Sequence, residues 1–158
     1  MKKFAFIIPF IFIFSCASIQ DIEKKKAEGD AIVETFNASY EETFNAIKFV
    51  IRHSENWFIN MTSRSTVVDY NKEDKMIIIN IVTMGSIDIG IFFEPLNNSK
   101  TKVFFVKGAF TGAAWRETKI RAIIDEAQYY LVNGETAYRK YTHEKEERRL
   151  GEVSKPSF

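Results

Sequence analysis

The fold is decided by residues 76–106, which read MIIINIVTMGSIDIGIFFEPLNNSKTKVFFV. Residues 76–82 are almost entirely aliphatic, as expected for a strand that is covered on both faces. Residues 87–94 carry isoleucine or phenylalanine at every second position, which is the period of a strand. Residues 95–99, PLNNS, are typical of a turn, and residues 103–106 resume the extended pattern. This stretch therefore predicts a buried strand followed by an antiparallel hairpin.

Helical periodicity flanks these strands on both sides. Ser39 and Glu42 have the S-x-x-E spacing of a capping box, which predicts the start of a helix that ends near Ser54. The core-facing stripe of this helix is Tyr40, Phe44, Ile47 and Ile51. The stripe of a second helix is Ile120, Ile123, Ile124, Ala127 and Leu131. Asn133 and Gly134, which follow it, form a usual C-terminal signal.

The order of the predicted elements defines the fold class. Short extended segments are expected at residues 31–38, 57–62 and 67–70. Helix, strands and helix in this order predict an α+β domain at residues 31–134. We expect two layers, in which two helices pack on a twisted, mainly antiparallel sheet of four to five strands. Residues 135–158 are rich in charge and predict a C-terminal tail that is partly helical or disordered.

The N-terminal residues have the layout of a secretory signal. Lys2 and Lys3 form a positive start, and residues 4–14 are uncharged and apolar, interrupted only by Pro9. As a helix this run spans roughly 16 Å, which is short against a hydrocarbon core of about 30 Å. The segment therefore predicts export of the chain rather than a membrane span.

Ile13-Phe14-Ser15-Cys16 ends this segment and contains the only cysteine of the chain. It resembles the lipobox of bacterial lipoproteins, in which an aliphatic, a variable and a small residue precede the cysteine. The resemblance implies that residues 1–15 are removed as a lipoprotein signal peptide. It also implies that Cys16 carries a diacylglyceryl group on its thiol and an acyl group such as palmitate on its new amine, which together form a stable membrane anchor. The alternative is an ordinary signal peptide followed by an incidental cysteine.

The residues after the cysteine indicate location and linkage. Ala17 stands where the sorting rule of this lipoprotein class places Asp in proteins retained in the inner membrane. The resemblance therefore implies an outer-membrane protein that faces the periplasm or the cell surface. Residues 16–30 are polar and predict a tether between lipid and domain. The run Lys24-Lys25-Lys26 can touch anionic headgroups, but the favoured interpretation is a solvated linker in which Glu23 and Glu28 offset this charge.

The domain has a resemblance of its own. GIFFEP at residues 90–95, followed by the hairpin turn and a long terminal helix, resembles a group of small bacterial envelope lipoprotein domains without assigned activity. The resemblance covers residues 30–134. The chain is more distantly similar to the sheet-and-helix modules of outer-membrane assembly lipoproteins, which act through protein contacts. An envelope protein is therefore the expected partner.

Charge and motif content argue against several functions. Without Lys2 and Lys3, the 22 basic residues become 20 against 21 acidic ones, so no excess of positive charge favours nucleic acid. His53 and His143 lie far apart and outside any ligand spacing, so we expect no metal and no cofactor. His53 is expected near the end of the first helix, where a cation interacts favourably with the helix dipole. The usual hydrolase, phosphate-loop and dinucleotide motifs are absent from the sequence, and we expect no enzyme.

Trp115 and Arg116 are the candidate binding residues besides Cys16. They follow a run of small residues at 108–114, and a large aromatic side chain beside an arginine in a flexible loop can anchor a partner. The favoured alternative is that Trp115 closes the core beneath the second helix.

These observations predict a lipid-anchored module of the cell envelope that acts without catalysis, as a protein-interaction or structural unit. The alternative is a carrier of a small apolar ligand or lipid. Its aromatic lining would come from Phe92, Phe93, Phe104, Phe105 and Phe110. Core packing explains these phenylalanines equally well.

Overall fold

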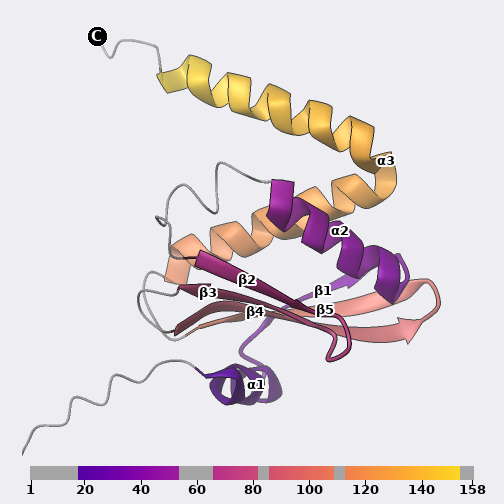
Figure 1. Ribbon diagram of the computed structural model, residues 1–158, viewed down its shortest axis with the longest axis vertical. Helices are drawn as coiled ribbons and strands as arrows, with labels where there is room; N and C mark the ends of the chain where they lie inside the picture. The colour runs from indigo at the N-terminus through magenta and orange to yellow at the C-terminus, as the bar shows by residue number, and fades with distance from the viewer. Residues whose placement is uncertain (1–17, 54–65, 82–85, 109–112, 154–158) are drawn as a thin grey trace, which may run out of the picture.

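A computed structural model describes residues 18–53, 66–81, 86–108 and 113–153 of the chain (Figure 1). The elements in chain order are α1 (Ile19–Ala27), β1 (Ile32–Phe36), α2 (Tyr40–His53), β2 (Thr66–Asn71), β3 (Met76–Ile81), β4 (Ser86–Asn97), β5 (Lys100–Lys107) and α3 (Ala113–Val153). This order confirms the predicted α+β class. The described residues contain one helix more than expected, which is α1.

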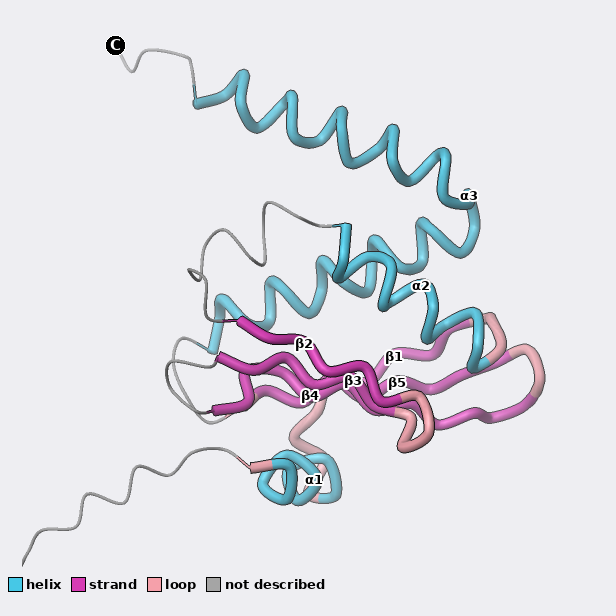
Figure 2. Tube along the Cα trace, in the orientation of Figure 1, coloured by secondary structure: helices cyan, strands magenta, loops and turns pink. Residues whose placement is uncertain are grey.

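The five strands form one antiparallel sheet in the order β1-β5-β4-β3-β2 (Figure 2). The predicted hairpin is β4 and β5, and Ser99 N donates to Asn97 Oδ1 at 2.8 Å in its turn. The aliphatic strand is β3, which lies between β2 and β4. It buries Ile77 and Ile79 on one face of the sheet and Ile78 on the other, as its continuous apolar run predicts.

The main core lies between one face of the sheet and the helices α2 and α3 (Figure 1). Alternate strand residues and the predicted apolar stripes of both helices fill it. The capping box at the start of α2 is formed, because Ser39 N donates to Glu42 Oε2 at 2.9 Å and Glu42 N donates to Ser39 Oγ at 3.3 Å. Hydrogen bonds from the Ser39 hydroxyl and backbone N–H lower the pKa of the Glu42 carboxyl.

The extra helix α1 packs on the opposite face of the sheet (Figures 1 and 2). Ile22, in the middle of α1, is fully buried against Ile78, Phe92 and Val106. Gly90 permits this close approach, because a Cβ at that position would lie 2.5 Å from Cγ2 of Ile22. The two faces of the sheet thus carry separate apolar clusters, a large one under α2 and α3 and a small one under α1.

This finding corrects the interpretation of residues 16–30 as a solvated tether. From Ile19 to Ala27 the chain is helical, and Ser18 and Asp21 form a second capping box at its start. Hydrogen bonds from Ser18 lower the pKa of the Asp21 carboxyl. The physical reason for the docking is Ile22, whose burial removes an isolated apolar side chain from water.

The helix α3 bends at Gly134, where the sequence predicts a helix end. Gly134 has φ 80° and ψ 174°, a conformation that is open essentially only to glycine. After the bend, residues 135–153, here called the α3 arm, fold back over the preceding part of the helix (Figure 1). The predicted tail is therefore helical as far as Val153. Its Tyr138 is fully buried in the main core, so the core extends past residue 134.

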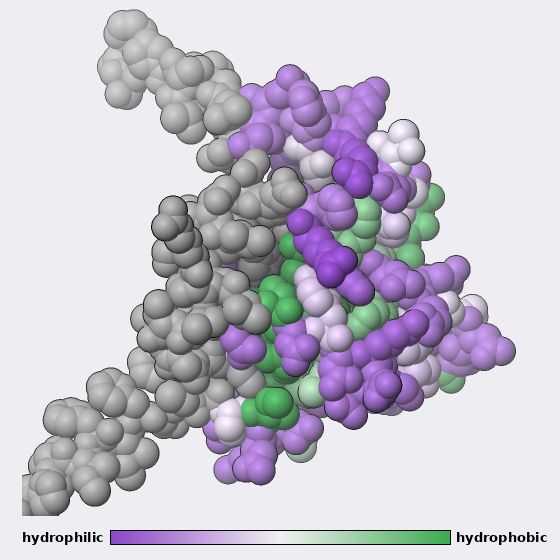
Figure 3. Space-filling model, viewed as in Figure 1, coloured by the Kyte–Doolittle hydropathy of each residue, from purple (hydrophilic) through white to green (hydrophobic). Residues whose placement is uncertain are grey.

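Hydrophilic residues dominate the face of the molecule shown in Figure 3, and hydrophobic residues show mainly in its middle part. Among the described residues, none of the helices combines the length and the apolar character that crossing a bilayer requires. The strand expected at residues 57–62 lies outside the described residues.

Candidate functional site

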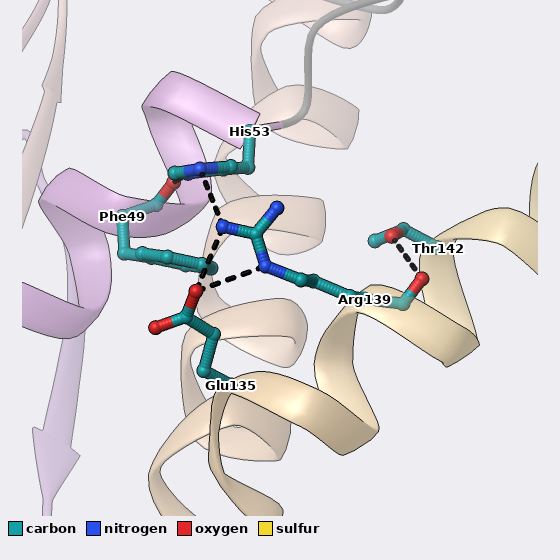
Figure 4. Close-up of polar contacts among 5 residues, drawn as sticks. All are labelled: Phe49, His53, Glu135, Arg139 and Thr142. Atoms are coloured by element: carbon teal, nitrogen blue, oxygen red, sulfur yellow. Dashed lines mark hydrogen bonds and ion pairs between the residues drawn. The ribbon is translucent and has the colours of Figure 1, made fainter.

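Aromatic and charged side chains gather where the end of α2 meets the α3 arm (Figure 4). We call this group the corner cluster, and it consists of Phe49, His53, Tyr130, Glu135 and Arg139. Phe49 and His53 come from the last two turns of α2, Tyr130 from α3 before the bend, and the other two from the arm. Three helical segments thus meet in one group of side chains.

His53 is the polar centre of the corner cluster. Arg139 Nη2 donates to His53 Nε2 at 3.2 Å, and a guanidinium group has no acceptor. Nε2 is therefore the acceptor in this contact, and Nδ1 lies 2.9 Å from the Phe49 carbonyl oxygen, to which it can donate. His53 is the last residue of α2, as expected, and its ring contacts the guanidinium group of Arg139.

Arg139 is held by three partners in the corner cluster. Its Nη2 and Nε donate to Glu135 Oε1 at 2.7 and 2.9 Å, and its guanidinium lies 5.4 Å from the ring centroid of Phe49. The side chains of Arg139 and Glu135 are 55% and 51% exposed, so the group is ordered by contacts and still accessible. Phe49 is also stacked on His53 at 3.8 Å and lies 4.7 Å from Tyr130 between ring centroids.

A partly buried polar network fixes the α3 arm next to this cluster. Tyr138 Oη donates to Glu126 Oε2 at 2.8 Å, and Lys145 Nζ donates to Glu126 Oε1 at 2.7 Å. Burial and the Glu126 carboxylate both raise the pKa of the Tyr138 hydroxyl. Burial by itself would lower the pKa of Lys145, but the hydrogen bond and charge of Glu126 outweigh it and raise this pKa. The Tyr141 ring of the arm stacks at 4.6 Å on the ring of Tyr129, which lies on α3 before the bend.

The corner cluster contains residue types that are common in protein interfaces. Arginine and tyrosine are enriched among the residues that dominate protein interfaces, because they combine large contact area with directed hydrogen bonds. Because Arg139 is held in place by Glu135, His53 and Phe49, little of its conformational freedom remains to be lost on binding. Within the described ranges, no group of three or more His, Cys, Asp and Glu side chains could hold a metal ion.

The structure places the predicted site residues apart from this cluster or outside the described residues. Cys16 lies outside them. Trp115 and Arg116 lie in the first turn of α3 and not in a loop, which corrects the loop prediction. Ala113 and Ala114 are strong helix formers, which accounts for the early helix start. The side chains of Trp115 and Arg116 lie outside the described part, so their role in binding stays a prediction.

The phenylalanines that motivate the carrier hypothesis have packing partners in the structure. Phe93 and Phe105 are buried in the main core, and Phe92 is buried beneath α1. Phe104 packs against the same small cluster as Phe92. Phe110 lies outside the described residues. Packing therefore accounts for the described four.

Sequence reasoning missed the corner cluster, because its members are distant in the chain. His53 and Arg139 are 86 positions apart, and no motif relates them. The available signal was Asn133-Gly134, which marks the bend that turns the arm back. Tyr138 was the second signal, since an aromatic residue in a charged stretch indicates a packed helix face.

Comparisons with known proteins identified no match for this chain. No family model matches the chain, and neither a curated protein nor a solved structure does.

Proposed function

We propose that this protein is a lipid-anchored module of the cell envelope, held in the outer membrane through acyl chains on Cys16, that binds a protein partner through the corner cluster. The anchor is supported by the positive start, the apolar run and the lipobox-like residues that end at the only cysteine. The protein-binding role is supported by one observation above all. Arg139 is ordered by three partners and yet remains half exposed beside the ring of Phe49.

The position of the corner cluster suits this role. It belongs to the α2 and α3 layer, and α1, which follows Cys16 closely in sequence, lies across the sheet from that layer (Figure 1). A partner in the aqueous phase can therefore approach the cluster while the N-terminus stays at the membrane. Val132, at 82% relative accessibility, lies two residues before the bend and three before Glu135 in the chain, and it offers an exposed apolar side chain there.

Photo-crosslinking in cells tests the partner. A photoreactive amino acid replaces Val132 in the full-length chain, and crosslinked proteins are identified by mass spectrometry. The proposal predicts a discrete crosslinked species that is lost when Arg139→Ala is added. Arg139→Ala is expected to remain folded, because exposed ion pairs and cation–π contacts each contribute only about 1 kcal/mol to stability. A lost crosslink in this variant therefore reports lost binding.

The chain offers a matched control. Arg121 is paired with Glu117 four residues earlier on α3, as Arg139 is with Glu135, and its side chain is 57% exposed. Arg121→Ala is therefore expected to keep the crosslink. Equal loss in both variants, or a crosslink that survives Arg139→Ala, would remove the corner cluster from the proposal.

A further inference from the structure

The helix α1 begins at Ile19, three residues after Cys16 in the sequence. Ser18 is its N-cap, with Ser18 N donating to Asp21 Oδ2 at 2.8 Å and Asp21 N donating to Ser18 Oγ at 3.2 Å. Two extended residues span at most about 7 Å. Anything attached to Cys16 therefore lies close to the first turn of α1, whatever the path of the chain between them.

The helix α1 is also fixed to the domain, so its position determines how the domain is oriented. Ile22 is 0% exposed against the sheet, and Gly90 leaves no room for even a methyl group between them. Lys25 Nζ donates to the Lys107 carbonyl oxygen at 3.0 Å, and Lys26 Nζ lies 4.7 Å from the ring centroid of Phe104. An anchor at Cys16 therefore holds the whole domain and not only a flexible leader.

Two exposed apolar side chains lie on the same side of the sheet as α1. Ile19, in the first turn of α1, is 42% exposed. Val33 of β1 is 46% exposed and is paired with Phe104, which packs against the cluster under α1. These side chains offer apolar contacts to whatever covers this side of the domain.

We propose that the α1 side of the sheet lies against the lipid bilayer, with Ile19 in the interfacial region and the corner cluster turned toward water. This inference rests on the acylation of Cys16 that the proposed function includes. Residues 19–28 carry three lysines and three acidic residues, namely Asp21, Glu23 and Glu28, so their formal charges cancel. Because this segment has no net formal charge, contact with the bilayer is expected to come from the short link to Cys16 and from the apolar side chains. Anionic lipid is not required for this contact.

Fluorescence quenching tests this orientation on the lipidated chain in phosphatidylcholine vesicles. The only native thiol is consumed by the lipid, so a cysteine introduced in place of Ile19 or of Val132 is labelled alone. Nitroxide groups on the lipid headgroups are expected to quench a label at position 19 several-fold more than one at position 132. Gln20→Cys, also in the exposed first turn of α1, is a second variant in case the Ile19 variant perturbs the helix.

The outcomes separate this inference from the proposed function. Equal quenching at positions 19 and 132 overturns the orientation, as does quenching that appears only with added phosphatidylglycerol. A flexible insertion of about ten Gly and Ser residues before Ser18, with an r.m.s. span of about 17 Å, must reduce the quenching at position 19, and unchanged quenching overturns the tether argument. A chain that lacks acyl mass and does not float with vesicles overturns the anchor itself.

Discussion

Gly90→Ala places a methyl group in the contact between α1 and the sheet. The added Cβ would lie 2.5 Å from Cγ2 of Ile22 and 3.1 Å from Cε2 of Phe92. Ile22 is β-branched and fully buried, so its side chain cannot simply rotate away, and the helix must shift. The substitution therefore tests whether α1 is seated on the sheet at this glycine.

The magnitude follows from two opposing effects. Overpacking a buried contact lowers the free energy of unfolding by about 1–3 kcal/mol. Replacing glycine by alanine reduces the entropy of the unfolded chain, which raises the free energy of unfolding by about 0.4–1 kcal/mol. We expect Gly90→Ala to lower the free energy of unfolding by about 1–2 kcal/mol. In an Ile22→Ala background the clashing Cγ2 is absent, and most of this loss should disappear.

Urea unfolding followed by circular dichroism measures both effects. The four proteins of the double-mutant cycle are compared as chains from residue 16 that carry Cys16→Ser. We expect a coupling free energy of about 1–3 kcal/mol between positions 22 and 90. Additive effects, within about 0.5 kcal/mol, would show that α1 does not pack on Gly90 and would refute the docking.

Three further predictions concern the α3 arm. Gly134→Ala should lower the free energy of unfolding in urea by about 1–3 kcal/mol, because the φ of 80° and ψ of 174° at this position are strained for alanine. An unchanged urea midpoint would contradict the bend. Tyr138→Phe should lower the free energy of unfolding by about 1.5–3 kcal/mol, because a buried hydrogen bond to the Glu126 carboxylate is lost. A decrease smaller than the error of the measurement would argue against this hydrogen bond. The folded-state pKa of Tyr138 lies above its ordinary value of 10.0, so the folded chain holds this proton more tightly than the unfolded chain does. The stabilising contribution of the Tyr138 proton should therefore be fully present below pH 10, and the free energy of unfolding should decline above that pH. The decline should be smaller in Tyr138→Phe. Equal pH profiles for both proteins would contradict the raised pKa of Tyr138.

The strands and the two large helices follow from the periodicity of the sequence. Residues 76–82 and 87–94 indicate their strands because burial on one or both faces of a sheet imposes a regular pattern on the side chains. Ser39 and Glu42 mark the start of α2 in the sequence, and the structure contains the same pair of hydrogen bonds. Local patterns of this kind are predictable because their cause is local.

The helix α1 and the corner cluster could not be predicted in the same way. A single buried side chain, Ile22, docks α1, and one apolar residue among lysines and glutamates sets up no period. Its local signals were the S-x-x-D spacing of Ser18 and Asp21 at its start and Gly29 just after its end. Arg139 meets His53 only because the chain bends at Gly134, so their contact depends on the tertiary fold. The surface that we propose for a partner therefore became visible only in three dimensions.

The intact mass of the native chain, extracted from membranes of the producing cell, tests the central claim most directly. The account predicts a chain that starts at Cys16 and carries the added mass of a diacylglyceryl group and an acyl chain. A free thiol at Cys16, or residues 1–15 still attached, would contradict the anchor and with it the orientation of the domain at the membrane.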